Sequence, residues 1–515
     1  MHLLATETAT LDEIETAVDL AQTPADIVVL SFSDSDLSAL AASWTKDRDA
    51  LPSLRLASLK ELRHPMSVDL YVDAVISHAR LVIVRSLGGL DYWRYGFERI
   101  AATCARDNIL LVALPGDDRP DARLSALSTA TQDAVALFDR YFREGGPENI
   151  ANALRLAASL LGRDAHAGEP KQLGAAIGLC ADGSTTEIDA LGLEDDARPA
   201  ALILFYRSSL LAADTRPILA LIRALDREGL APLAVAVTSL KDPEAGRHVA
   251  SLIARAKPSI VLNATAFSAL RTDDTTVLDA ADCPVLQVAL AGAAHEAWAE
   301  SARGLSPSDL AMNVVLPELD GRLFTRAISF KAKTAPDPDL QYSTVIHEPA
   351  ADRIAFVAKL ASSWARLSHK PRAQRRVALV ISDYPARGGR TGHACGLDTP
   401  ESVREILALL KEAGYETDAA TWPASEIIAR LTDPASGDVL RVPVSDYRAW
   451  LAALPDQVGK DIGDAWGAPE ADTAVENGQF KFPCLRAGNI IVLLQPDRGS
   501  LGDRKQGYQD RKSVV

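Results

Sequence analysis

VALVISDYPARGGRTGHACGLDTPES, residues 377–402, joins a strand to a helix through a loop rich in glycine and arginine. The β-branched run Val377–Ser382 is typical of a buried strand. We expect a helix to follow, with Thr399 as its N-cap and Pro400 as its first residue. Apolar residues then recur at helical spacing. This order of strand, loop and helix is the repeating unit of an α/β fold.

The loop inside this unit has the composition of an anion-binding site. Its glycines permit positive φ and close approach of a ligand, and its arginines present planar donors that match carboxylates. His393 lies in the same loop, and we consider it as a candidate catalytic residue that accepts a proton or escorts a metal. The alternatives are that His393 packs within the loop and that the stretch is an ordinary connection with a helix cap. The predicted substrate-binding residues of this loop are Arg387, Gly388, Gly389, Arg390 and Gly392.

Short apolar runs alternate with helical patterns over most of the chain, as expected for parallel strands joined by crossover helices. We therefore predict the α/β class, with tandem doubly wound parallel-sheet domains followed by the start of a third, truncated domain. The predicted boundaries are an N-terminal domain at 1–162, a linker at 163–199, a second domain at 200–370 and the third domain from 371 to 509.

The predicted elements follow from these patterns. Strands are expected at Ile27–Leu30, Leu81–Val84, Ile109–Leu114, Ala201–Tyr206, Leu233–Val237, Ile260–Leu262, Val285–Leu290, Val377–Ser382, Thr417–Thr421 and Ile490–Leu494. Helices are expected near Leu11–Ala21, Ser67–Ser77, Tyr92–Asp107, Arg216–Glu228, Glu244–Ala256 and Ala350–Leu367. The stretch Lys331–Tyr342 has two prolines and no apolar repeat, so we expect it to be an exposed excursion.

Three further loops carry an arginine after a predicted strand, and open α/β sheets bind ligands at the carboxyl ends of their strands. Arg85 follows Leu81–Val84 and precedes the aromatic stretch LDYWRY. Tyr206 and Arg207 follow ALILF, and Arg498 follows the strand IIVLLQ. We predict these four residues to bind substrate. The alternatives are aromatic side chains that anchor a helix, a packing role for Tyr206 and Arg207, and a solvated turn around Arg498.

The composition excludes several classes of protein. Of the 515 residues, 48% are hydrophobic and 24% are charged, which is typical of a folded globular protein. The net charge of −15 argues against sequence-independent binding of nucleic acid. The five cysteines form no CxxC pair, so we expect a reducing cytoplasm. Acidic residues near the start argue against a signal peptide, and no apolar run reaches the ~18 residues of a membrane span.

Common catalytic motifs are absent from the sequence. The dipeptide Gly459-Lys460 is followed by Asp461, so there is no P-loop for ATP. The dipeptide His347-Glu348 does not extend to HExxH, and there is no GxSxG motif. The pattern therefore identifies no metal ligands, and they stay unknown.

Five segments resemble the amino-terminal part of the large subunit of aerobic cobaltochelatases. They are VRSLGGLDYWRYG, ILFYRSSLLAADTRPILALIRAL, SARGLSPSDLAMNVVLPELDGRLFTRAISFK, ALVISDYPARGGRTGHACGLDTPES and IIVLLQPDRG. They occur in the order of that family, and the similarity extends from Met1 to about Gly502. A more distant similarity is to the large subunit of magnesium chelatases.

The resemblance implies ATP-dependent insertion of cobalt(II) into the corrinoid hydrogenobyrinic acid a,c-diamide, a step of aerobic cobalamin biosynthesis. In that family the large subunit binds the tetrapyrrole, and cobalt is a substrate. Two smaller subunits, including an AAA-type ATPase, use ATP and Mg. The alternatives are a magnesium chelatase large subunit and a non-catalytic α/β module that binds small molecules.

The chain is much shorter than the members of the family that it resembles. We therefore expect an amino-terminal fragment that is inactive alone. The ending DRKSVV, residues 510–515, matches the translation of a common sequencing adaptor, so we expect it to be a non-native tail.

Overall fold

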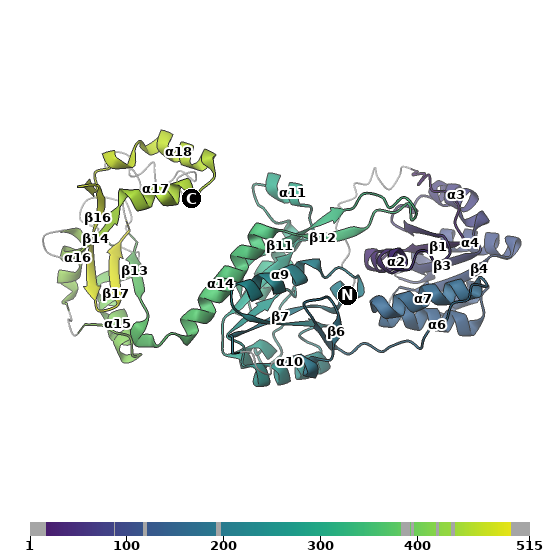
Figure 1. Ribbon diagram of the computed structural model, residues 1–515, viewed down its shortest axis with the longest axis horizontal. Helices are drawn as coiled ribbons and strands as arrows, with labels where there is room; N and C mark the ends of the chain where they lie inside the picture. Colours follow the sequence, from purple (N-terminus) through teal and green to yellow (C-terminus); the bar gives the residue numbers. More distant parts are fainter. Residues whose placement is uncertain are drawn as a thin grey trace. The chain divides into compact units, whose positions relative to one another are not determined.

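In the computed structural model the chain is described over residues 17–86, 88–116, 121–191, 197–382, 392, 396–418, 422–433 and 438–495. It divides into two compact units, Met1–Ala365 and Arg366–Val515, both drawn in Figure 1. The first unit contains a four-stranded and an eight-stranded sheet, and the second contains a five-stranded sheet. Parallel pairing dominates the first two sheets, which confirms the predicted α/β class.

The first sheet has the strand order β2-β1-β3-β4, and every pair in it is parallel. Its strands are β1 (Ile27–Ser31), β2 (Leu54–Ser58), β3 (Leu81–Ser86) and β4 (Leu110–Pro115). Three of the four were predicted from their apolar runs. The prediction missed β2 because Arg55 interrupts its apolar pattern. The buried Arg55 guanidinium donates to the Thr23 carbonyl at 2.8 Å and to the Thr23 hydroxyl at 2.7 Å.

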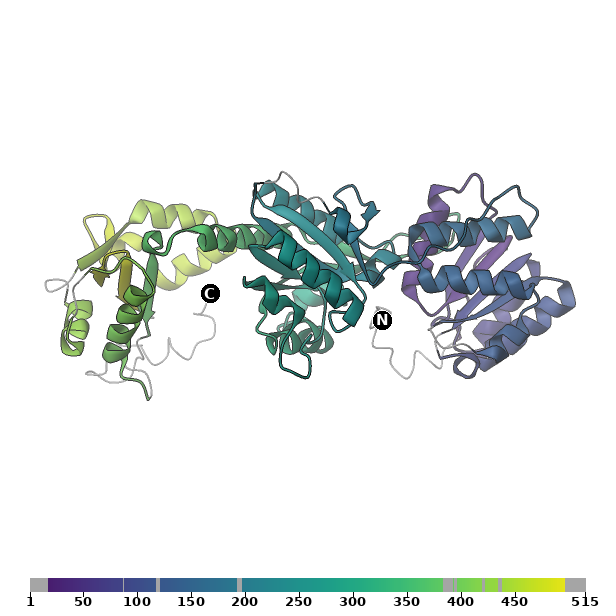
Figure 2. The same ribbon diagram turned by 90° about the horizontal axis from the view of Figure 1, so that it is seen from below.

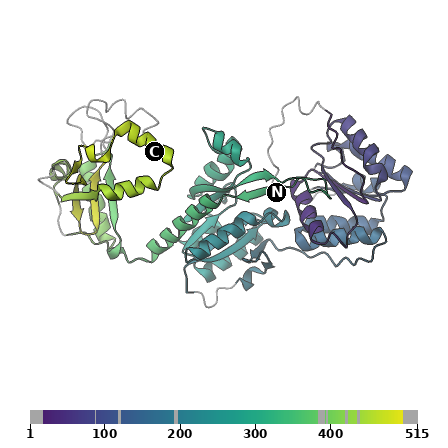
Figure 3. The same cartoon turned by 45° about the horizontal axis from the view of Figure 1, so that its top comes forward.

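Helices cover both faces of this sheet (Figures 1 and 3). One face packs against α2 (Asp34–Lys46), α6 (Gln132–Glu144) and α7 (Gly146–Leu160). The other packs against α3 (Pro65–Ala74), α4 (Arg94–Asp107) and α5 (Ala122–Leu127). The helix predicted at Leu11–Ala21 is wrong for residues 17–21, which are not helical, and its first part lies outside the described residues.

The second sheet has the order β12-β11-β10-β9-β7-β8-β5-β6. Its five central strands are parallel, and antiparallel strands flank them at both edges. In that order the strands are Val345–Pro349, Leu323–Lys333, Val285–Leu290, Ile260–Asn263, Ala200–Tyr206, Ala231–Val237, Ala176–Leu179 and Thr185–Thr186. The predicted linker at 163–199 therefore contains two strands of this sheet, which are too short to give a recognisable pattern.

Helices lie on both faces of the second sheet as well (Figure 2). The helices α9 (Arg216–Arg227) and α14 (Ala351–His369) pack on one face, and α10 (Pro243–Ala256) packs on the other. All three were predicted from their apolar spacing. Their burial explains why the strands between them are continuous apolar runs.

The connection between β11 and β12 is anchored to the first sheet. Leu340 is 1% exposed and belongs to the core that α2, α6 and α7 form with that sheet. The Gln22 side-chain amide donates to the Gln341 carbonyl at 2.8 Å, and Arg55 donates to the Asp339 carbonyl. The prediction of an exposed excursion at Lys331–Tyr342 is therefore wrong for the buried Leu340, whereas Lys333, Ala335, Pro336, Pro338 and Asp339 are exposed as predicted. One buried leucine makes the anchor, and a single apolar residue gives no periodic signal.

The second unit has a mixed sheet in the order β13-β17-β16-β14, with β15 paired to β16. Among its described strands, only β13 (Val377–Ile381) and β17 (Ile490–Leu494), both predicted, are parallel to each other. The others are β14 (Asp438–Pro443), β15 (Val475–Glu476) and β16 (Gln479–Ala487). The strand predicted at Thr417–Thr421 is wrong for residues 417–418, and the rest lies outside the described residues.

One face of this sheet packs against α15 (Thr399–Glu412) and α16 (Ala424–Thr432). The remaining helices of the second unit are α17 (Val444–Ala452) and α18 (Asp456–Trp466). Asp398 is the N-cap of α15, and Thr399 is its first residue, one position before the predicted start. Asp398 accepts a hydrogen bond from the Glu401 amide at 3.1 Å, so its carboxylate takes the capping role.

Candidate functional site

The predicted arginine loops of the second unit start from neighbouring strands at one edge of its sheet. Ile381, the last residue of β13, pairs with Leu494, the last residue of β17. The Gln495 amide then donates to the Ile381 carbonyl at 2.8 Å. The strand that precedes Arg387 and Arg390 and the strand that precedes Arg498 therefore end side by side.

Most of the predicted residues in these two loops lie outside the described residues. They are Arg387, Gly388, Gly389, Arg390, His393 and Arg498. Their roles stay predictions, and the described residues define only the edge of the sheet from which the loops begin.

Gly392 is the predicted loop residue that the structure describes. Its φ is +67°, which favours glycine, and a Cβ here would lie 3.1 Å from Ile428 Cδ1 and 3.6 Å from Ile381 Cγ2. Gly392 therefore lies against α16 and the end of β13. Gly396 has a φ of +75°, but a Cβ at that position would meet no atom within 4 Å, so only its backbone conformation favours glycine.

The start of α15 carries negative charge. Asp398 caps the helix, and hydrogen bonds from Arg404 hold the pKa of the exposed Glu401 carboxyl below its ordinary value. The Asp398 carboxylate already accepts from one of the first amides of the helix. An anionic ligand at this edge would therefore depend on the arginines of the loops and not on the helix N-terminus.

Arg85 lies inside the first unit. Its side chain is 7% exposed, and one terminal nitrogen lies 2.8 and 2.7 Å from the two carboxylate oxygens of Asp36. The Ser31 hydroxyl donates to the same carboxylate at 2.8 Å, and the guanidinium lies 5.6 Å from the centre of the Phe142 ring. Arg85 thus joins the ends of β3 and β1 to α2 and α6. Its predicted contact with substrate stays a prediction.

The aromatic residues that follow Arg85 divide into two groups. Trp93 is buried and its indole donates to the Leu62 carbonyl at 2.8 Å, which agrees with the packing alternative. Tyr92 is 59% exposed and lies edge-on to Phe32, with ring centres 5.0 Å apart. Tyr92 and Tyr95, which is 45% exposed, are therefore the aromatic side chains of this stretch that solvent reaches.

Tyr206 and Arg207 join segments of the second sheet. The Tyr206 hydroxyl donates to the Ala266 carbonyl at 2.8 Å, and burial raises the pKa of Tyr206 to about 12. Arg207 begins α8 (Arg207–Leu211) and donates to the carbonyls of Leu173 and Gly174 at 2.8 and 3.1 Å. Their side chains bond to the protein's own backbone, and their predicted role in binding stays a prediction.

A buried polar network at the carboxyl edge of the second sheet was not predicted. The Asn263 amide donates to Gln287 Oε1 at 2.7 Å, and Arg322 donates to the same oxygen at 3.3 Å. Arg322 also forms an ion pair with Asp320, and burial lowers its pKa. The signal was an amide side chain inside each of two apolar strands, IVLN and VLQVAL. Most polar atoms of the network bond to one another, whereas Arg322 Nε is buried without a hydrogen-bond partner among the described residues, so we assign the network no binding role.

Metal-ligand clusters, membrane-spanning helices and disulfides are absent from the described residues. No three His, Cys, Asp or Glu side chains in that part of the chain converge as metal ligands. Among the helices that the structure describes, none is both long and apolar enough to cross a bilayer. The four described cysteines, Cys104, Cys180, Cys283 and Cys484, are free thiols.

The fold and the sheet edge identify the structural class: this is an α/β protein with parallel strands and with loops at the carboxyl ends of those strands. A family model described as CobN/Magnesium Chelatase matches residues 139–515. The chain therefore belongs to the CobN/magnesium chelatase family.

Individual relatives agree with this assignment. The chain is 38% identical to the aerobic cobaltochelatase subunit CobN of Sinorhizobium sp, with 99% of this chain and 41% of the relative covered. Identity to the Pseudomonas aeruginosa subunit of the same name is 37%, over 99% of this chain and 42% of the relative. The chain thus spans about two fifths of the length of these relatives.

A solved structure shares the fold. It is the catalytic subunit of cobaltochelatase from Mycobacterium tuberculosis, with a TM-score of 0.72 and 27% sequence identity. The match covers 93% of this chain and 39% of that one.

Proposed function

We propose that this chain is part of the large, tetrapyrrole-binding subunit of an ATP-dependent cobaltochelatase. The reaction is insertion of Co(II) into hydrogenobyrinic acid a,c-diamide in aerobic cobalamin biosynthesis. The family assignment and the two relatives named as cobaltochelatase subunits support this proposal. The structural observation that supports it is that β13 and β17 are parallel and end at the paired residues Ile381 and Leu494, each followed in the sequence by an arginine-containing loop.

The proposed binding step uses charge. The corrinoid carries several carboxylates at its periphery, and each guanidinium can hold one carboxylate with two parallel hydrogen bonds. We assign this role to Arg387, Arg390 and Arg498. Gly388, Gly389 and Gly392 keep side chains away from the ring, and the close packing of Gly392 on Ile428 fixes where the loop returns to the core.

The proposed chemical step is exchange of two protons for one metal ion. Both inner N–H protons of the macrocycle must leave as cobalt(II), the second substrate, enters. We propose His393 as the first proton acceptor, because a neutral imidazole accepts a proton near pH 7. His393 takes up the two protons one after the other and passes each to solvent, and the macrocycle nitrogens bind the cobalt.

The energy source is proposed to lie on other subunits. The sequence has no P-loop, since Gly459-Lys460 is followed by an aspartate. Two smaller subunits, one of them an AAA-type ATPase, would use ATP and Mg and pass the resulting conformational change to this subunit.

Turnover measured in a full-length protein with its two smaller subunits tests the proposal. We expect cobalt insertion into hydrogenobyrinic acid a,c-diamide that depends on ATP, followed by the change in corrinoid absorbance. The second candidate is a magnesium chelatase large subunit, because the matching family model includes both chelatases. Magnesium insertion into a porphyrin without cobalt insertion into the corrinoid would establish that candidate instead.

A further inference from the structure

One edge of the second sheet is open over part of its length. The strand β12 pairs with β11 from Ser329 to Lys333 only. The next two β11 carbonyls are occupied, because Ala350 donates to Ile328 and Arg353 Nε donates to Ala327 at 2.6 Å. On the side away from β10, no described strand pairs with Leu323–Arg326.

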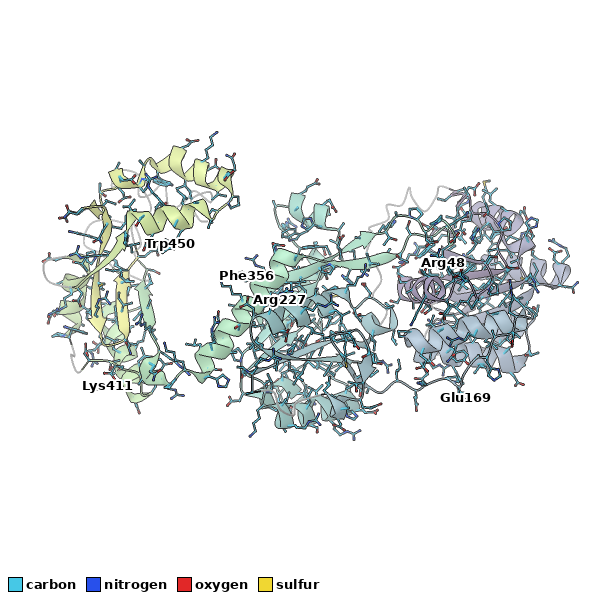
Figure 4. All side chains as sticks on the ribbon, in the orientation of Figure 1. Arg48, Glu169, Arg227, Phe356, Lys411 and Trp450 are labelled. Carbon is cyan, nitrogen blue, oxygen red and sulfur yellow. The ribbon has the colours of Figure 1, made fainter. Side chains whose placement is uncertain are left out.

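Exposed apolar side chains surround this open segment. Leu323 and Phe324 on β11 are 47% and 37% exposed, and Phe356 on α14 is 43% exposed (Figure 4). Two further exposed residues, Val315 and Leu319, flank the short helix α13 (Leu316–Glu318), which packs beside β11. Monomeric proteins seldom leave an unpaired strand edge and an apolar cluster exposed together.

The charge at this edge is positive. The Arg326 guanidinium lies 3.7 Å from the centre of the Phe356 ring. It has no ion pair with any carboxylate in the described part of the chain. Burial and then the nearby charge of Arg326 lower the pKa of Arg353, and the Asp352 carboxylate opposes this shift only in part. A partner at this edge would therefore gain from an acidic side chain.

Taken together, these features describe a strand-addition site. We propose that Leu323–Arg326 binds an extended segment of a partner subunit as an additional strand. Apolar side chains of that segment would cover Phe324 and Phe356, and an acidic one would pair with Arg326. A second copy of this chain fits poorly, because its own Leu323–Arg326 segment contains no acidic side chain that could pair with Arg326. The identity of the partner rests on the proposed function, in which two smaller subunits assemble with this one.

Hydrogen exchange tests strand addition directly. The full-length large subunit is measured alone and after addition of each smaller subunit. We expect those amides of Leu323–Arg326 that point away from β10 to exchange quickly in the protein alone and at least about tenfold more slowly with one of the two partners. Unchanged exchange with both partners would overturn the inference. Slow exchange in the protein alone would also overturn it, because the edge would then be covered by its own chain.

A variant pair separates this interface from general effects. Phe324→Ser with Arg326→Glu should weaken association with that subunit at least about tenfold, measured by titration. The control is Met66→Ser with Arg63→Glu, which also replaces one exposed apolar residue by serine and one exposed arginine by glutamate. These two residues lie beside the first sheet, so association should be unchanged. Equal association of both variants would contradict the inference. The Phe324→Ser, Arg326→Glu variant should still bind the corrinoid. If the unmodified protein does not bind the corrinoid, that result counts against the proposed function and not against this interface.

Discussion

The first and second units treat the ends of their parallel strands differently. In the first unit, strand-end arginines are bonded to the protein itself: Arg85 to the Asp36 carboxylate, and Arg207 to two backbone carbonyls. In the second unit, the ends of β13 and β17 adjoin and lead into two arginine loops, one of which returns through the tightly packed Gly392. A strand-end arginine is therefore weak evidence for a ligand unless the acids and carbonyls near it are known.

The sheets of the two units also differ in burial. All six residues of β3 are buried, whereas half-buried and exposed positions alternate along β13 until the buried Ile381, and Val380 is 56% exposed. Helices cover both faces of β3 and only one face of β13 among the described elements. We therefore expect substitutions at strand ends in the first unit to reduce stability and those in the second unit to reduce ligand binding.

The largest effect is expected for Arg85→Ala. Removing the guanidinium leaves the Asp36 carboxylate buried without its cation, which costs about 3–5 kcal/mol in comparable cases. Urea denaturation of the variant measures the change in the free energy of unfolding. Replacing both partners by leucine should recover much of the loss, because no charge is then left buried. A loss below ~1 kcal/mol for Arg85→Ala would show that the pair is not structural and would restore Arg85 as a binding candidate.

Leu340→Ala should have the next largest effect. The side chain fills the core of the first sheet from the β11–β12 connection, so its loss leaves a cavity that costs about 2–5 kcal/mol. Thermal unfolding checks this value. The matched control is Leu319→Ala, since Leu319 is 64% exposed and should change stability by less than about 0.5 kcal/mol. Equal effects of the two variants would contradict the anchoring of the connection.

A pH dependence is expected from His347 in the first unit. Burial, with Lys331 and Arg216 nearby, holds its pKa well below the ordinary value. As the pH falls, His347 is protonated in the unfolded chain before it is protonated in the folded protein. The free energy of unfolding is therefore unaffected by this histidine above about pH 6.5 and is lowered by about 1 kcal/mol near pH 5.5. Burial raises the pKa of Asp214, whose proton uptake opposes the loss at lower pH. His347→Gln should remove this slope in denaturation curves, and an unchanged slope would exclude His347 as its source.

The smallest effect on stability is expected for Gly392→Ala, a change in the second unit. The positive φ and the contact of 3.1 Å with Ile428 together should cost about 1–2 kcal/mol. Gly396→Ala is the matched control, because it has a similar φ and no neighbour within 4 Å. Denaturation of both variants isolates the contact with Ile428. Identical changes in the free energy of unfolding would mean that the contact between residue 392 and Ile428 of α16 has no effect on stability.

The sequence predicts those parts of the fold that have a continuous apolar pattern. The strands β1, β3, β7 and β17 and the helices α9 and α14 were recognised in this way. The strand β2 was missed because a backbone-bonded arginine interrupts it, and β14 and β16 were missed because their residues are only partly buried. Local patterns do not report such tertiary contacts.

The candidate site could be predicted only as a set of loops. Glycine spacing indicated the loop that Gly392 now places beside β13 and α16. The pairing of Arg85 with Asp36 joins residues 49 positions apart, and no local pattern reveals it. The same holds for the adjacency of β13 and β17, which lie far apart in the sequence and still bring two predicted loops to one edge.

Corrinoid affinity of arginine variants tests the central claim most directly. A full-length protein carrying Arg390→Ala and Arg498→Ala is titrated with hydrogenobyrinic acid a,c-diamide and compared with one carrying Arg207→Ala. We predict that the double variant binds at least about tenfold more weakly with unchanged unfolding, because each lost charge-assisted pair contributes ~1.5–3 kcal/mol. The Arg207→Ala variant should keep its affinity. Unchanged binding by the double variant, or loss of binding with Arg207→Ala alone, would contradict a site at the end of β13 and β17.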